Sequence, residues 1–149
     1  MSILNNFRLR VIFFLISLTC VFTFTLPSTG YCDEWVLVGT NGNFIFYYNN
    51  SNIKINKETK QIEVWLKSVY TDKRRELSEP KHQNINYDLL LELFDYDKMR
   101  SKELKIISHY RSGEVKSRDG YMKWVSLWPA TGMYNRSLNK ILADYKLKK

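Results

Sequence analysis

Gln61-Ile62-Glu63-Val64-Trp65-Leu66-Lys67-Ser68-Val69-Tyr70 is the stretch of this chain that decides the fold. It is the longest run of β-forming residues in the sequence, and it predicts a long β-strand. Shorter runs of the same kind lie on both sides of it. The chain after residue 32 has no internal repeat, no low-complexity segment and no Pro/Gly-rich linker, so one sheet-based domain is expected.

The segment before this strand predicts a hairpin. Trp35–Gly39 and Asn43–Tyr48 read as two strands, and Asn41-Gly42 between them is a turn dipeptide. Glycine tolerates the positive φ that tight hairpin turns require, which gives this signal a physical cause. A second turn at 49–52 leads into a short strand at Ile53–Ile55.

The segment after the long strand opens with a polar excursion and returns to strands. Residues 71–84 are dense in charge and contain Pro80, which predicts a solvated connection with one helical turn at most. Further strands are expected at Tyr87–Asp95, whose leucines would also suit a helix, and in three later runs: Leu104–Tyr110, Glu114–Ser117 and Trp124–Trp128. In the first of these, Ser108 and Tyr110 share one side of the strand and His109 points to the other.

The C-terminal segment changes to a helical period. Thr131 can serve as its N-cap, and the start of the helix could also lie a few residues later. The apolar stripe that follows consists of Tyr134, Leu138, Ile141, Leu142 and Tyr145. The opposite, polar face is expected to hold Asn135, Arg136, Asn139 and Lys140, with Asp144 on its flank. An apolar stripe of this width favours docking on a sheet over insertion into a membrane. The prediction is an α+β domain: an antiparallel sheet of about six strands with one C-terminal helix packed on it.

The N-terminus predicts a leader. Arg8 and Arg10 precede the uncharged run Val11–Leu26, and small residues follow after Pro27. This is the order of a secretory signal peptide, and the run falls short of the roughly 20 apolar residues that span a bilayer. We expect residues 1–32 to be the signal peptide and 33–149 the domain, with cleavage after Gly30 or before Asp33. An uncleaved membrane anchor is the alternative, and the residues before Cys20 match a lipidation site poorly.

Charge and cysteine content limit the partners and the chemistry. The chain carries a formal net charge of +8, which favours acidic partners, although lysines that merely keep the protein soluble are the preferred explanation of the charge. Its two cysteines, Cys20 and Cys32, lie in or beside the leader, so no disulfide or cysteine metal site is expected within the domain. Export to the periplasm or the outer cell surface makes nucleic acid an unlikely ligand.

Catalytic motifs are missing from the sequence. His82 and His109 lack a second histidine or paired carboxylates at ligand spacing, and no Gly-x-Ser-x-Gly or phosphate-binding glycine loop occurs. We therefore expect no enzyme, no cofactor and no metal. The abundant aromatics are instead expected to build the structure, and the residues singled out for this role are Trp35, Tyr48, Trp65, Tyr96, Tyr110, Trp124 and Tyr145.

The order of these elements resembles the surface-adhesin protein E family of Gram-negative bacteria. The resemblance runs from Trp35 to Tyr145 and rests on short matches: Trp35-Val36-x-Val38, Tyr47-Tyr48-Asn49, Asn52-Ile53, Val64-Trp65, the run from Tyr87 to Asp95, Tyr110 with Gly113, Trp124, Pro129 and the closing helix. It implies an exported antiparallel sheet with a C-terminal helix. The best-known member binds host matrix and plasma proteins.

Two departures from the family pattern occur together. Where the family commonly has a pair of cysteines, this chain has Tyr96 and Tyr145. A disulfide is typically worth about 2–4 kcal/mol, and an aromatic pair would return part of that. We therefore expect the two tyrosines to be in contact. Thr131 keeps a capping hydroxyl where the family pattern has serine.

Two functions follow from the sequence. The first is a non-enzymatic exported protein of the adhesin E type that binds a macromolecular partner, a protein or a glycan, by surface contact. The second is an envelope-associated structural or stress protein whose basic surface contacts lipopolysaccharide or peptidoglycan. The sequence leaves the oligomeric state open, a homodimer included.

Overall fold

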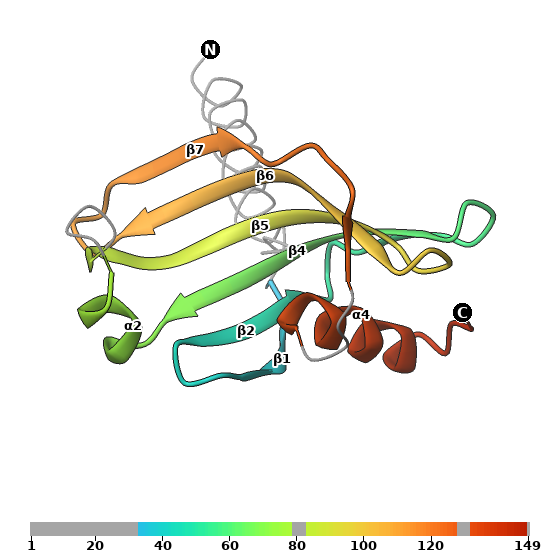
Figure 1. Ribbon diagram of the computed structural model, residues 1–149, viewed down its shortest axis with the longest axis horizontal. Helices are drawn as coiled ribbons and strands as arrows, with labels where there is room; N and C mark the ends of the chain where they lie inside the picture. The colour runs from blue at the N-terminus through green and yellow to red at the C-terminus, as the bar shows by residue number, and fades with distance from the viewer. Residues whose placement is uncertain (1–32, 79–82, 128–131, 149) are drawn as a thin grey trace, which may run out of the picture. The chain divides into compact units, whose positions relative to one another are not determined.

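A computed structural model describes residues 33–78, 83–127 and 132–148 of the chain (Figure 1). The predicted leader lies outside the described residues, and so do Pro80, His82, Trp128 and Thr131. The described strands are β1 (Trp35–Thr40), β2 (Phe44–Asn49), β3 (Lys54–Asn56), β4 (Gln61–Tyr70), β5 (Ile85–Asp95), β6 (Arg100–Tyr110), β7 (Val115–Asp119) and β8 (Val125–Ser126). The described helices are α2 (Asp72–Glu76) and α4 (Met133–Asp144).

All strand pairs of the sheet are antiparallel. Six strands form a continuous path in the order β1-β2-β4-β5-β6-β7, and the short strands β3 and β8 pair with β4 and β6. The sheet thus has eight strands, where about six were expected. An antiparallel sheet with a C-terminal helix is the expected α+β fold. The leucine-rich run of β5 is a strand, because its neighbours β4 and β6 pair with it along nearly its whole length.

The hairpin between β1 and β2 forms as the sequence predicts. Gly42 has a φ of +82°, a conformation that favours glycine. The side-chain Oδ1 of Asn41 accepts hydrogen bonds from the backbone N–H groups of Asn43 (3.1 Å) and Phe44 (2.9 Å). The turn is therefore held by its own asparagine, as Asx turns commonly are.

Helix α4 packs on one face of the sheet, beside β1 and β2 (Figure 1). We call this face the helix-bearing face. Alternation along the strands places one set of side chains under the helix, and the buried core that results consists of Tyr48, Ile62, Val64, Leu66, Leu90, Phe94, Tyr96, Ile106, Leu127, Leu138, Ile141 and Leu142. Within the described residues, no helix has the length and apolar character that crossing a membrane requires.

The start of α4 and its polar face can be compared with the sequence expectation. Its N-cap is Gly132, whose extended backbone makes no side-chain capping bond, so the helix begins within the few residues after Thr131 that the sequence allows. The assignment of Asn135 to the polar face is wrong, because its side chain is only 3 % exposed. Its Nδ2 donates to the backbone oxygen of Leu127 at 3.0 Å, so this amide is buried to tie the helix to the segment after β8.

Two tyrosine hydroxyls hold the end of α4 to the sheet. Tyr48 donates to Oδ2 of Asp144 at 2.6 Å, and Tyr145 donates to Oδ1 of Asn50 at 2.7 Å. Tyr96 is buried in the core and Tyr145 packs against the same core. Among the described residues the two rings do not form an aromatic pair, and the contact expected between them stays a prediction. The hydroxyl of Tyr145 connects the end of the helix to Asn50 instead.

Candidate functional site

The helix-bearing face changes character from one cross-strand row to the next. One row of register partners is apolar up to its last member and runs Tyr48, Leu66, Leu90, Ile106, Arg118. The next row on this face lies two residues further along each strand and consists of Phe46, Ser68, Asp88, Ser108 and Lys116. Core side chains of α4 pack over the first row. The polar residues of the second row mark where the packed core ends.

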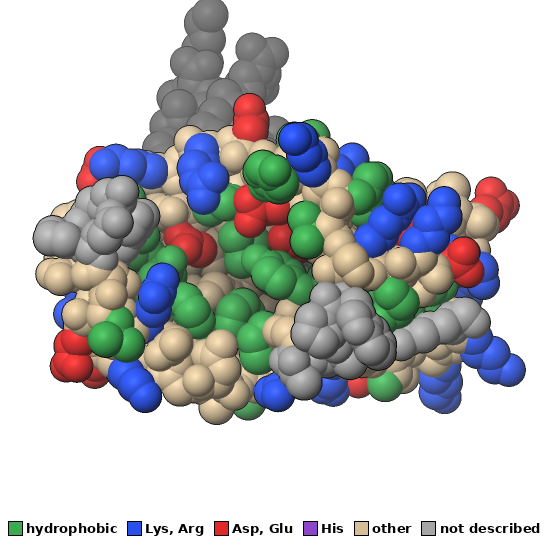
Figure 2. Space-filling model, viewed as in Figure 1, with side chains coloured by type: hydrophobic (Ala, Val, Ile, Leu, Met, Phe, Trp, Pro, Cys, Tyr) green, Lys and Arg blue, Asp and Glu red, His purple; other side chains and the backbone are tan. Residues whose placement is uncertain are grey.

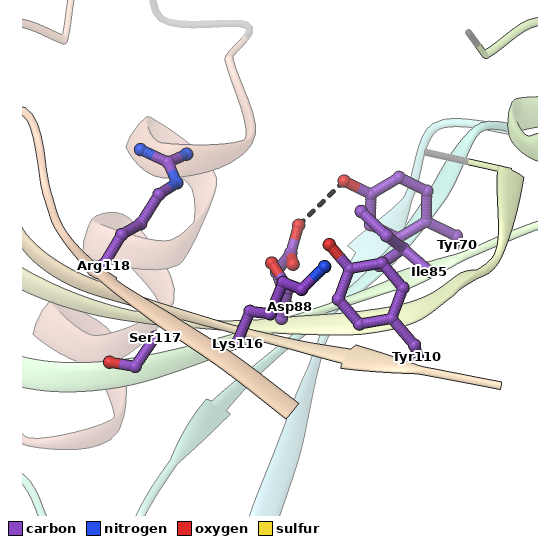
Figure 3. Close-up of a pocket in the computed structure, with 8 residues that line it drawn as sticks. Tyr70, Ile85, Asp88, Tyr110, Lys116, Ser117 and Arg118 are labelled. Carbon is purple, nitrogen blue, oxygen red and sulfur yellow. Dashed lines mark hydrogen bonds between the residues drawn. The ribbon is translucent and has the colours of Figure 1, made fainter. Parts of the chain in front are cut away.

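A pocket of about 420 Å³ lies beyond that boundary (Figure 3). It is lined by Tyr70, Ile85, Asp88, Ser108, Tyr110, Lys116, Ser117 and Arg118. We call this part of the helix-bearing face the open half. Figure 2 shows the same face hollowed in its middle, where hydrophobic and acidic side chains gather, with Lys and Arg mostly around the hollow. The residues come from four adjacent strands or their ends, so the sheet itself fixes their spacing.

Asp88 forms the polar centre of the pocket. The hydroxyl of Tyr70 donates to its Oδ2 at 2.7 Å (Figure 3). Burial, together with this bond to a carboxylate, raises the pKa of Tyr70 far above its usual range, so the phenol stays a donor. Oδ1 of Asp88 is buried and has no hydrogen-bond partner among the described residues. Asp88 thus holds one acceptor that the described part of the fold leaves unpaired.

Two cations from β7 complete the open half. Nζ of Lys116 lies 5.0 Å from the centre of the Tyr110 ring and 3.2 Å from Oε1 of Glu114. The side chain of Arg118 forms no hydrogen bond or ion pair within the part of the chain that the structure describes, and Figure 3 shows its guanidinium extending away from Asp88. The pocket thus combines aromatic surface, one carboxylate and two positive charges. Such a set suits the binding of a polar, partly anionic group.

Glu92 is a buried carboxyl beside this site that the sequence interpretation missed. It is 2 % exposed and sits opposite Glu103 in the register of β5 and β6. Burial, and secondarily the charge of Glu103, raises its pKa to about 8, which a hydrogen bond from Ser101 only partly offsets. At neutral pH the group is therefore mostly protonated. Its place between Leu90 and Phe94 in the alternation of β5 was the signal that could have found it.

Tyr134 of α4 links the helix to these acids. Burial raises the pKa of its phenol, and the charges of Glu92, Glu103 and Asp88 add to the effect in that order. These carboxyls act on one tyrosine because alternation on β5 and β6 turns them all to the helix-bearing face. The first turn of α4, which carries Tyr134, is therefore close enough to Glu92, Glu103 and Asp88 to feel their charges.

The aromatics singled out from the sequence occupy three settings. Tyr48 and Tyr96 are core residues, and Tyr145 packs against the core. Tyr110 lines the pocket. The three tryptophans Trp35, Trp65 and Trp124 are partly exposed. Nζ of Lys67 lies 5.5 Å from the ring centre of Trp35. Cζ of Arg100 and Nζ of Lys102 lie 4.4 Å and 5.2 Å from the ring centre of Trp124.

His109 does not join the pocket. Its ring stacks on Tyr87 with ring centres 4.3 Å apart, on the sheet face opposite to that of its neighbours Ser108 and Tyr110. Within residues 33–78, 83–127 and 132–148, no three His, Cys, Asp or Glu side chains gather as metal ligands would. Of the residues discussed, Tyr70, Asp88 and Tyr110 are the ones that the fold brings together.

Comparison of the chain with models of known families, with curated proteins and with solved structures finds no match. The resemblance to the adhesin E pattern therefore rests on the quoted residues alone.

Proposed function

We propose that this protein is an exported, non-enzymatic binding protein of the adhesin E type that holds a macromolecular partner on the open half of its helix-bearing face. The observation that carries the proposal is the pocket beside the core. Helix α4 completes the core over one part of the face, while Tyr70, Asp88 and Tyr110 line a pocket in the other. A protein of matrix type or a glycan is the expected partner.

The arrangement of polar groups supports binding by contact. Tyrosine rings supply a large, rigid contact area with a polar end, a combination that is common at binding surfaces. Asp88 offers an acceptor to a hydroxyl or N–H donor, and Lys116 and Arg118 offer donors to an acid. A partner that fills the pocket satisfies groups of both kinds at once.

The test measures binding of the full chain, produced with its own N-terminus, to immobilised extracellular-matrix proteins, plasma proteins, lipopolysaccharide and peptidoglycan. Tyr110→Ala should weaken binding by about tenfold or more, in keeping with about 1.4 kcal/mol for the loss of one aromatic contact. Tyr47→Ala is the matched control. Tyr47 is also partly exposed but lies on the other face of the sheet, between the buried Phe46 and Tyr48.

Salt separates the two functions that the sequence suggests. Binding to an anionic polymer of the envelope should fall steeply between low salt and 1 M salt, where the screening length is only about 3 Å. A contact through the pocket, which combines aromatic area with a few charges, should fall less. A steep loss with every probe would replace the adhesin-type proposal by the envelope-associated one. Equal binding by the Tyr110 and Tyr47 variants would remove the open half as the site.

A further inference from the structure

We propose that the outer edge of β7 accepts an extended segment of the partner as an additional antiparallel strand, and that this segment carries acidic side chains at alternate positions. The inference rests on the proposed function and specifies the chemistry of the partner. It concerns a sheet edge, which offers backbone groups in addition to side chains. Addition of a strand to such an edge is a common way of recognising a peptide.

The register shows which backbone groups point outward. The N–H of Tyr110 donates to the carbonyl of Glu114, and the N–H of Gly120 donates to that of Leu104. In an antiparallel pair, hydrogen-bonded and non-bonded pairs alternate, so Lys116 and Arg118 bond to β6. Val115, Ser117 and Asp119 therefore direct their N–H and C=O groups away from β6.

This outer edge is accessible and regular. All five residues of β7 are exposed, and β7 ends the strand order of the described sheet. Its pairing with β6 runs without interruption from Val115 to Asp119. The other end of the sheet differs, because β1 carries a register shift between Leu37 and Gly39. A bulge of that kind disturbs an edge and disfavours strand addition.

The side chains of β7 determine which strand fits. Lys116 and Arg118 both point to the helix-bearing face, and on an added strand the residues opposite them form the non-hydrogen-bonded pairs, whose side chains approach most closely. Opposite charges in such pairs are stabilising and like charges are destabilising. An acid opposite each of these two cations is therefore favoured, with one residue between the two acids.

The same charges act against pairing of β7 with a second copy of itself. A two-fold antiparallel pair centred on Ser117 places Lys116 opposite Arg118. Centring the pair on Lys116 places Lys116 opposite its own copy, and centring it on Arg118 does the same for Arg118. Each of these three registers brings like charges together. In these registers the edge favours a foreign acidic strand over a second copy of this chain.

The experiment titrates the full chain with a capped peptide that has the core Lys-Glu-Thr-Glu-Val, matched to the five residues of β7 in antiparallel order, and threonines at both ends. Backbone hydrogen exchange at Val115, Ser117 and Asp119 should slow on binding. A peptide of the same composition, with both glutamates moved by one position, should bind about tenfold more weakly or not at all.

Ser117→Pro provides the sharpest variant. Proline is tolerated on an edge strand where the N–H faces solvent, so the fold should persist, which thermal unfolding checks. The outward N–H at the centre of the edge is lost, and peptide binding should fall by about tenfold or more. Ser117→Ala keeps that N–H and should bind as the parent does.

Each result bears on a separate statement. Equal binding of the two glutamate peptides, or unchanged binding by the Ser117→Pro variant, overturns strand addition at β7. If the matrix or glycan probes still depend on Tyr110 in that case, the proposed function stands and only the edge inference falls. If the peptide binds as predicted while Tyr110→Ala leaves the other probes unaffected, the edge is a site and the pocket is not.

Discussion

The two halves of the helix-bearing face are built by the same strands and differ in what occupies them. In the covered half, side chains such as Leu66 and Phe94 meet Leu138 and Ile141 of α4, and all four are fully buried. In the open half, the same strands line a pocket instead of packing against the helix. Two residues along β5, from Leu90 to Asp88, are enough to pass from the packed core to the pocket.

This difference shows that the residues of the sheet alone can determine where the apolar core of the helix-bearing face ends. A row with Ser68, Asp88 and Ser108 at its centre cannot contribute much apolar area, and burying a carboxylate without partners is costly. The core therefore stops where the polar row begins. The open half remains available for a partner, while the covered half supplies the stability that keeps the pocket residues in place.

The largest expected effect is in the covered half. Leu138 is fully buried, and Leu138→Ala should lower the free energy of unfolding by about 2–5 kcal/mol. Leu77→Ala, at a leucine that is 67 % exposed, should change it by less than about 0.5 kcal/mol. Urea unfolding of both variants measures the difference. Equal losses would show that α4 contributes little to the core.

The second effect concerns Glu92, which lies between the core residues Leu90 and Phe94 on β5. Its folded pKa of about 8 lies above the pKa of 4.5 that an exposed glutamate has, so the folded state binds more protons than the unfolded state between these values. The free energy of unfolding should therefore be highest below pH 4.5 as far as Glu92 is concerned, fall as the pH rises towards 8, and become level above it. The slope can reach about 1.4 kcal/mol per pH unit.

Glu92→Gln removes this titration. The variant should lose the decline between pH 5 and 8, and should be more stable than the parent above pH 8, where the parent must keep a charge buried near Glu103 and Tyr134. Glu63→Gln is the matched control, because Glu63 lies on β4, is partly exposed and pairs with Lys54 at 2.6 Å. A decline that persists in the Glu92 variant would contradict the assignment.

Much of the fold could be predicted because its signals are local. The long strand β4 begins and ends at the residues that the sequence indicates, Gln61 and Tyr70, and the Asn41-Gly42 turn follows from the φ that glycine tolerates. The short strands β3 and β8 lie at the runs expected at Ile53–Ile55 and Trp124–Trp128, and they pair at the margins of the sheet. The prediction placed Asn135 on the polar face because helical periodicity sorts residues only by their polarity. Its burial depends on a hydrogen bond to the carbonyl of Leu127, eight residues earlier, which the periodicity does not show.

The site was less predictable than the fold. Tyr110 was singled out as a structural aromatic, and the structure places it in the pocket wall. Asp88 and Tyr70 are 18 positions apart in the sequence and meet only through the register of β4 and β5. No motif marks such a pair, because its geometry comes from strand alignment and not from local spacing. Alternation alone would have placed Asp88 and Glu92 on the core side of β5.

The smallest effect compares one tyrosine hydroxyl in each half. Tyr48→Phe removes a bond to Asp144, but Lys140 still holds that carboxylate at 2.8 Å, so the loss should stay below about 1 kcal/mol. Tyr70→Phe removes the bond to Oδ2 of Asp88, whose Oδ1 already lacks a partner among the described residues, so this loss should be larger, at about 1–3 kcal/mol. Urea unfolding at pH 7 gives both values. A greater loss for Tyr48→Phe would mean that Asp88 gains other donors when Tyr70 is removed, and the pocket would then hold no unused acceptor for a ligand.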